Sequence, residues 1–156
     1  MSNSYSSTHY PLIELQQEKS WQQFHQQYPA VSDCLSSEQL ALFKQALALS
    51  DFILRSALQA PELVVELFKS EQLLSSNTPN YSEMLIVSLN TCTSEEQLHK
   101  VLRQFRLVQM VHIAVGDFLL NISLDESLKR LSALADSLIL CASPPDKVVA
   151  LCPNFM

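Results

Sequence analysis

Residues Thr93–Asn121, TSEEQLHKVLRQFRLVQMVHIAVGDFLLN, form the longest stretch of the chain with a clear helical pattern. Apolar side chains recur in it at alternating steps of three and four residues, the spacing of one face of an α-helix. Thr93 is expected to cap this helix, with Glu96 completing a capping box. The stripe consists of Leu98, Val101, Phe105, Val108, Val115, Leu119 and Ile122. A helix of this length spans roughly 40 Å, so we expect it at the centre of a helical bundle.

Two residues stand out within this stretch. His112 interrupts the apolar stripe, and its position predicts a hydrogen-bonded histidine in the core or at an interface rather than a catalytic one. Gly116 is the only glycine in the chain, and inside a helix it costs up to about 1 kcal/mol relative to alanine. We expect it to permit the close approach of a neighbouring helix, with a small kink as the alternative.

The composition favours an all-α fold, which we expect to be a single irregular bundle of about five or six helices. The 156 residues include one glycine, show no strand-like alternation and are rich in Leu, Ala, Gln and Glu. Ten basic and sixteen acidic residues give a net charge of −6. Binding to nucleic acid is not expected, because it requires a concentrated basic surface. Nor is a membrane span, since no apolar run reaches the ~18 residues required.

The cysteines indicate a reducing compartment. Cys34, Cys92, Cys141 and Cys152 are scattered along the chain and form no C-x-x-C pair. Because no signal peptide is recognisable, we expect reduced thiols and a cytoplasmic protein.

The chain divides into a flexible N-terminus (1–10), a helical domain (11–142) and a tail (143–156). Besides the central helix, we predict helices over residues 11–28, 36–59, 62–69 and 80–89, and one that begins at Ser123 and stops before Pro144. Three of these helices begin with a capping pair: Ser36 with Gln39, Asn80 with Glu83, and Ser123 with Glu126.

The first and last helices carry apolar residues that we expect to face inward. In the first helix these are Leu12, Leu15, Trp21, Phe24 and Tyr28. In the last helix they are Leu124, Leu128, Leu131, Ala135 and Leu138.

The residues alone predict no catalytic, cofactor-binding or metal-binding site in this chain. No two histidines are spaced four apart on a helix, so a helical zinc motif is missing. A nucleophile elbow or a phosphate-binding loop requires glycines that the sequence does not have. Lys100, Arg103 and Arg106 line part of the central helix, where a solvated face or ion pairs with neighbouring helices is favoured over an anion site.

Two stretches nevertheless resemble a known family in the order and spacing of their residues. The match spans roughly Leu40 to Ile139 and is to the N-terminal helical region of bacterial glutamate–ammonia-ligase adenylyltransferase, the bifunctional enzyme that adenylylates and deadenylylates glutamine synthetase. The first stretch contributes Ser50, Asp51, Phe52, Ser56, Pro61, Glu62 and Leu63. The second and more specific stretch contributes Leu102, Arg103, Phe105, Arg106, Met110, Ile113, Ala114, Asp117, Leu124, Glu126, Leu131, Ser132, Leu134, Ala135 and Asp136.

The resemblance implies a role without chemistry for this chain. In that family the helical region leads into a nucleotidyltransferase domain, where a glycine-rich turn and a serine–aspartate–x–aspartate pattern hold ATP and magnesium. This sequence contains neither element, so no catalytic residue is carried over. The resemblance therefore implies an N-terminal, non-catalytic fragment of the deadenylylating half, inactive alone. A self-standing helical adaptor without enzymatic activity is the alternative.

The expected partner is the nucleotidyltransferase domain of the same enzyme. Glutamine synthetase and the PII signalling protein are further candidate partners implied by the resemblance. With 47% hydrophobic and only 17% charged residues, the domain is expected to expose an apolar patch where that partner packs. Arg103, Arg106 and His112 are the predicted interface residues.

Overall fold

The structure is a computed structural model that describes residues 11–75 and 77–142. These ranges contain helices and turns but no strand, which confirms the predicted all-α class. The predicted flexible N-terminus and tail lie outside the described residues. The helices are α1 (Pro11–Gln27), α2 (Pro29–Ser32), α3 (Ser37–Leu49), α4 (Asp51–Gln59), α5 (Pro61–Lys69), the 3-10 helix η1 (Glu71–Leu74), α6 (Tyr81–Leu89), α7 (Glu95–Leu119) and α8 (Leu124–Ala142).

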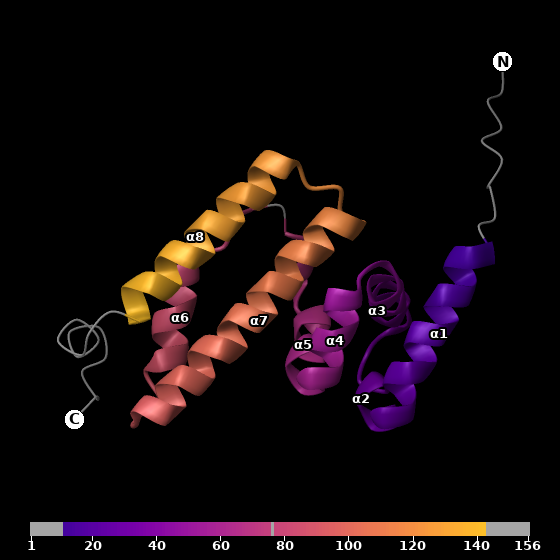
Figure 1. Cartoon of the computed structure of the whole chain (residues 1–156), viewed down its shortest axis with the longest axis horizontal. Coiled ribbons are helices and arrows are strands. Elements are labelled where there is room, and N and C mark those ends of the chain that lie inside the picture. Colours follow the sequence, from indigo (N-terminus) through magenta and orange to yellow (C-terminus); the bar gives the residue numbers. More distant parts are fainter. Residues whose placement is uncertain (1–10, 76, 143–156) are drawn as a thin grey trace, which may run out of the picture.

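Helix α7 joins the two halves of the molecule (Figure 1), whereas the sequence predicted it at the centre of one bundle. Its C-terminal half packs into a first core with α1, α3, α4, α5 and η1. A second core is formed by α6, α7 and α8, with α8 running back antiparallel to α7. No helix within the described ranges has the length and hydropathy needed to cross a membrane.

Three phenylalanine rings hold the first core together. The rings of Phe24 on α1 and Phe43 on α3 meet edge to face with centroids 5.1 Å apart. Phe43 meets Phe68 on α5 in the same way at 4.9 Å. All three side chains are buried, so they combine burial with the favourable edge-to-face geometry of aromatic pairs.

The predicted helix over residues 36–59 is divided in two at Ser50. Ser50 has extended backbone angles, and its hydroxyl accepts a hydrogen bond from the Ile53 N–H at the start of α4. A serine before an aspartate is a capping signal that competes with continuation of the helix. Together with the short α2, this division gives eight α-helices in the described ranges instead of five or six.

Capping pairs were predicted correctly for three helices and one residue out of register for the fourth. Ser36 and Gln39 form the predicted capping box. Asn80 and Ser123 accept hydrogen bonds from the backbone of Glu83 and Glu126, respectively. The prediction of Thr93 as the cap of the central helix was wrong, because Ser94 takes that place and accepts from the Gln97 N–H.

The closest approach to Gly116 comes from a turn, while the neighbouring helix α8 contributes an ordinary contact through Nη1 of Arg130. A Cβ atom at this position would lie 2.6 Å from Cδ1 of Ile122, which folds back over the end of α7. Asn121 makes this reversal with a positive φ of 50°, which asparagine tolerates better than most residues. The N–H groups of Leu120 and Ile122 both donate to the Gly116 carbonyl.

The N-terminal end of α1 does not face the core. Phe24 is fully buried and Trp21 and Tyr28 are partly buried, but Leu12 and Leu15 are exposed, contrary to prediction. Figure 1 shows the reason: the first turns of α1 extend past the helices on which its C-terminal part packs.

Candidate functional site

The apolar stripe of α8 lies mostly on the outside of the molecule. We predicted that this stripe would face inward, but Leu124 is 72% and Leu128 is 51% exposed. Ala135 is also exposed, and Leu131 and Leu138 are only partly buried. The prediction was therefore wrong for Leu124, Leu128 and Ala135, whereas Leu131 and Leu138 do pack against the second core.

The buried face of α8 is instead a second stripe that begins with polar side chains. It consists of Ser127, Arg130, Leu134, Ser137 and Cys141. These residues also follow steps of three and four. The pattern was visible in the sequence, but serine and arginine are normally exposed, and the leucine stripe gave the stronger signal.

Each polar residue of this buried face has a partner on another element. Ser127 donates a hydrogen bond to the carboxylate of Asp117 on α7. The hydroxyl of Ser137 lies 2.9 Å from that of Ser82 on α6 and also donates to the Ala133 carbonyl. Burial of this polar face is therefore compensated by hydrogen bonds.

Arg130 is the centre of the polar contacts and is only 1% exposed. Its Nε donates to Oε1 of Glu126 at 3.2 Å. Its Nη2 donates to the carbonyl oxygens of Ser75 and Asn77, at 3.4 and 3.5 Å. Glu126 also accepts a hydrogen bond from the Thr78 hydroxyl. Arg130 and Glu126 thus tie α8 to the segment that connects the two cores.

His112 belongs to this buried region. It is 3% exposed, which agrees with the core position predicted as one of two alternatives, and its role as an interface residue stays a prediction. Burial lowers the pKa of His112, and the nearby positive charge of Arg130 lowers it further. Backbone hydrogen bonds with Leu73 and Gln72 oppose that shift in the pKa of His112. The ring therefore sits in the fold as a neutral core group.

Arg103 and Arg106 lie together on the outer surface, beside the exposed stripe of α8. They border a groove of about 430 Å³, which we call the α7–α8 groove. Neither arginine makes an ion pair with another described residue. The rest of the groove is apolar and is lined by Leu102, Ala135, Leu138 and Ile139.

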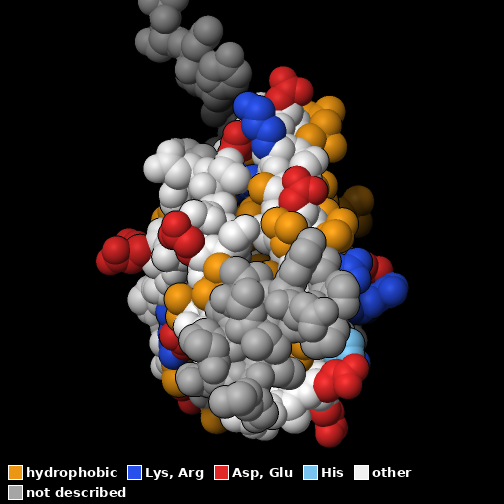
Figure 2. Space-filling view, turned by 90° about the vertical axis from the view of Figure 1, so that its left-hand side faces the viewer, with side chains coloured by type: hydrophobic (Ala, Val, Ile, Leu, Met, Phe, Trp, Pro, Cys, Tyr) orange, Lys and Arg blue, Asp and Glu red, His pale blue; other side chains and the backbone are white. Residues whose placement is uncertain are grey.

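A second groove uses a different face of α7. This α5–α6 groove has a volume of about 650 Å³ and lies where α5 and α6 flank α7. Its lining residues are Leu63, Glu83, Met84, Val87, Ser88, Val101, Gln104, Phe105, Val108 and Gln109. Figure 2 views the end of the molecule where α6 and the end of α8 lie, and hydrophobic side chains reach its surface beside charged ones.

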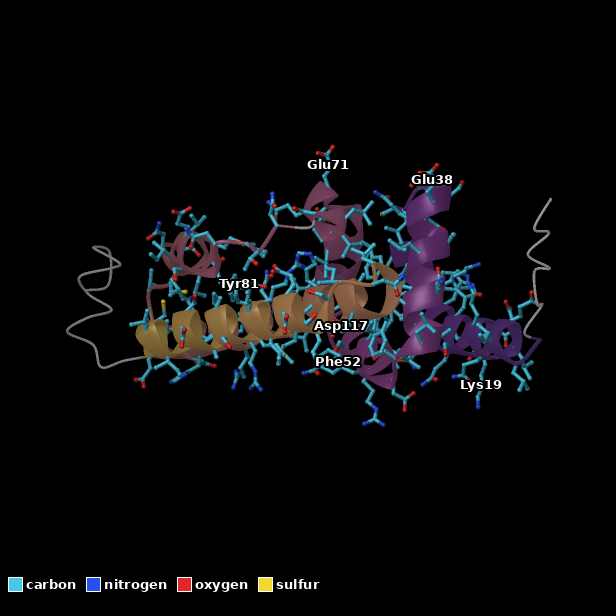
Figure 3. The ribbon with its side chains drawn as sticks, turned by 90° about the horizontal axis from the view of Figure 1, so that it is seen from above. Lys19, Glu38, Phe52, Glu71, Tyr81 and Asp117 are labelled. Carbon is cyan, nitrogen blue, oxygen red and sulfur yellow. The ribbon has the colours of Figure 1, made fainter. Side chains whose placement is uncertain are left out.

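The described residues do not fit a metal site, because they bring together no group of three His, Cys, Asp or Glu side chains that could hold a metal ion. Acidic side chains such as those of Glu38 and Glu71 point away from the body in Figure 3.

Comparison with known proteins gives one consistent family. The family model described as glutamate-ammonia ligase adenylyltransferase matches residues 40–151. The chain is 37% identical over 125 residues to the bifunctional glutamine synthetase adenylyltransferase/adenylyl-removing enzyme of Shewanella loihica. It is 34% identical over 132 residues to the protein of the same name from Shewanella oneidensis.

These matches cover most of this chain and a small part of each relative. The aligned residues make up 80% of the chain but 13% of the Shewanella loihica protein. For the Shewanella oneidensis protein the shares are 85% and 14%. No solved structure gives a significant match.

Proposed function

Because the chain belongs to the glutamate-ammonia ligase adenylyltransferase family, we propose that it is a non-catalytic helical module that scaffolds the nucleotidyltransferase domain of such an enzyme. Its relatives are named for adding adenylyl groups to glutamine synthetase and for removing them. In this proposal ATP and magnesium bind to the nucleotidyltransferase domain. Glutamine synthetase and the PII signalling protein are partners of the assembled enzyme.

The outward-facing stripe of α8 is the observation that supports this role. Helices normally bury their apolar stripe, and α8 leaves Leu124, Leu128 and Ile139 exposed. Contiguous apolar surface of this kind typically marks an interaction site. The α7–α8 groove continues that surface and adds Arg103 and Arg106, neither of which pairs with an acidic side chain in the described part of the chain. We place the nucleotidyltransferase domain on this surface, with the two arginines at its edge.

Binding to a separately expressed nucleotidyltransferase domain tests the proposal. The domain of the Shewanella loihica relative is a suitable probe, and titration calorimetry measures its affinity for the full chain. Leu128→Asp should weaken binding by about tenfold or more, because burying a leucine contributes about 1.5–3 kcal/mol. The Arg103→Glu, Arg106→Glu double variant should also weaken it. Leu74→Asp changes another exposed leucine, on η1, and should leave the affinity unchanged.

Two outcomes would contradict the proposal. If the wild-type chain does not bind the domain at all, the chain is better described as a self-standing adaptor. If Leu128→Asp and Leu74→Asp bind equally well, the α8 stripe is not the docking surface. In a separate titration, ATP with magnesium should give no binding signal, and micromolar binding would place a nucleotide site on this chain.

A further inference from the structure

The shape of the α5–α6 groove suits the binding of a helix. Helices α5 and α6 lie on the same side of α7, as Figures 1 and 3 together show, and α7 forms the floor between them. The floor is apolar, with Val101, Phe105 and Val108. The groove is open to solvent along its side, so it suits a polypeptide segment better than an enclosed small molecule.

Two polar groups of the groove both require a hydrogen-bond donor. Gln109 is 4% exposed, and its Oε1 is buried without a hydrogen-bond partner among the described residues. Leaving such an acceptor unsatisfied is unfavourable, and a donor brought by a ligand removes that cost. Glu83 supplies an exposed carboxylate that makes no ion pair with another described residue.

The exposed apolar side chain of α6 adds to this surface. Val87 lies one turn after Glu83 on the same face of the helix and is 69% exposed. The groove therefore combines an apolar floor and wall with Glu83, the one charged side chain among the described residues that line it. The α7–α8 groove has the opposite character, because its charged groups are two arginines.

We propose that the α5–α6 groove binds a basic amphipathic helix of a partner. The apolar stripe of that helix packs on Val87, Phe105 and Val108, and a lysine or arginine beside the stripe pairs with Glu83. A polar donor within the stripe hydrogen-bonds to Gln109. An acidic helix does not fit, because Glu83 would repel it and no cation of the groove would attract it.

Two synthetic amphipathic peptides of equal length test this proposal, and both carry the same leucine stripe with one asparagine in it as the donor to Gln109. One has lysines beside the stripe and the other has glutamates. NMR titration of the full, isotope-labelled chain should show saturable binding of the lysine peptide, with shifts at the groove residues of α6 and α7. Val87→Asp should weaken binding about tenfold. Glu83→Lys should lower the affinity for the lysine peptide and raise the affinity for the glutamate peptide.

Two further variants separate this groove from the surface assigned to the nucleotidyltransferase domain. Arg106 lines the α7–α8 groove, so Arg106→Glu should not change the affinity for the lysine peptide. Gln109→Leu should lower the affinity for the lysine peptide several-fold, while the melting temperature of the variant chain stays equal to that of the wild type or rises. Equal binding of the two peptides, or shifts centred on the α8 stripe, would overturn the proposal and leave the proposed function untouched.

Discussion

At the scale of single residues, Arg130 has the largest structural role in the polar region. In the fold, its guanidinium group donates hydrogen bonds to the Glu126 carboxylate and to two backbone carbonyl groups, which take the place of water. Those carbonyls belong to the segment that links η1 to α6. A positive charge can be buried there because its hydrogen-bonding capacity is largely met by fixed acceptors.

Replacing Arg130 should therefore destabilise the fold strongly. Arg130→Met should lower the free energy of unfolding by about 3 kcal/mol, because it leaves the carbonyls of Ser75 and Asn77 without their donor. Urea denaturation monitored by circular dichroism measures this change. Arg106→Met removes an exposed arginine and should cost less than about 0.5 kcal/mol. Similar losses in both variants would contradict the assigned role of Arg130.

His112 should make stability depend on pH in a defined window. Its pKa in the fold is lowered from the usual value of 6.5 by burial and by Arg130. As the pH falls through 6.5, the unfolded chain therefore takes up a proton before the folded chain does. The free energy of unfolding should decrease from that pH down to the lowered pKa of His112, and its contribution should be constant above it.

Replacement of the ring tests this pH dependence. His112→Gln should flatten the stability profile between pH 6.5 and the lowered pKa, as measured by urea denaturation across the range. Glu126 affects stability at lower pH than His112 does, because its hydrogen bonds with Thr78 and Arg130 hold the pKa of Glu126 below 4.5. An unchanged profile in His112→Gln would mean that other groups set the dependence.

At the scale of elements, the start of α7 shows how closely two capping candidates compete. Thr93 and Ser94 are adjacent, and each has an acidic or amide residue three positions later. Ser94 caps the backbone at Gln97, while the N–H and hydroxyl of Thr93 donate to the Gln97 side chain. Both residues are thus used, but only Ser94 satisfies a free N–H of the helix.

This difference predicts unequal effects of two similar substitutions. Ser94→Ala should lower the free energy of unfolding by about 1 kcal/mol, the typical contribution of a cap. Thr93→Ala breaks exposed hydrogen bonds to a side chain and should cost about half as much or less. Thermal unfolding of the two variants gives the comparison. A larger loss in Thr93→Ala would favour the capping box that the sequence suggested.

At the scale of the whole molecule, the two cores have different characters. The first core rests on the aromatic contacts between α1, α3 and α5. The second core mixes apolar side chains with the buried polar face of α8. Helix α7 belongs to both cores, so its apolar residues pack against two different sets of helices.

The central ring of the first core should be indispensable. Phe43→Ala should lower the free energy of unfolding by about 3–5 kcal/mol, because it removes the ring that touches both Phe24 and Phe68. A domain with a total stability of about 5–15 kcal/mol would be close to unfolding. Phe52→Ala, which changes a ring that is exposed on α4, is the matched control. Comparable losses, measured by urea denaturation, would mean that the aromatic contacts add little.

The sequence by itself determined the fold class, most helix positions and three of the four capping pairs. These features depend on interactions between residues three or four apart, which are written directly in the order of the chain. The family could also be identified from sequence, because the order and spacing of residues in its second stretch are specific. The position of Arg103 and Arg106 on an outer surface followed from their place on the helix.

Only the tertiary structure decided which face of α8 is buried. Its leucine stripe and its serine–arginine stripe have the same spacing. When partners on other elements are not considered, burial of the leucines has the more favourable free energy. The polar face goes inward because Asp117, Ser82 and the carbonyls of Ser75 and Asn77 are in place to receive it. These partners are distant in sequence, so no local pattern could reveal that burial of Arg130 would be compensated and that Leu124 and Leu128 would remain outside.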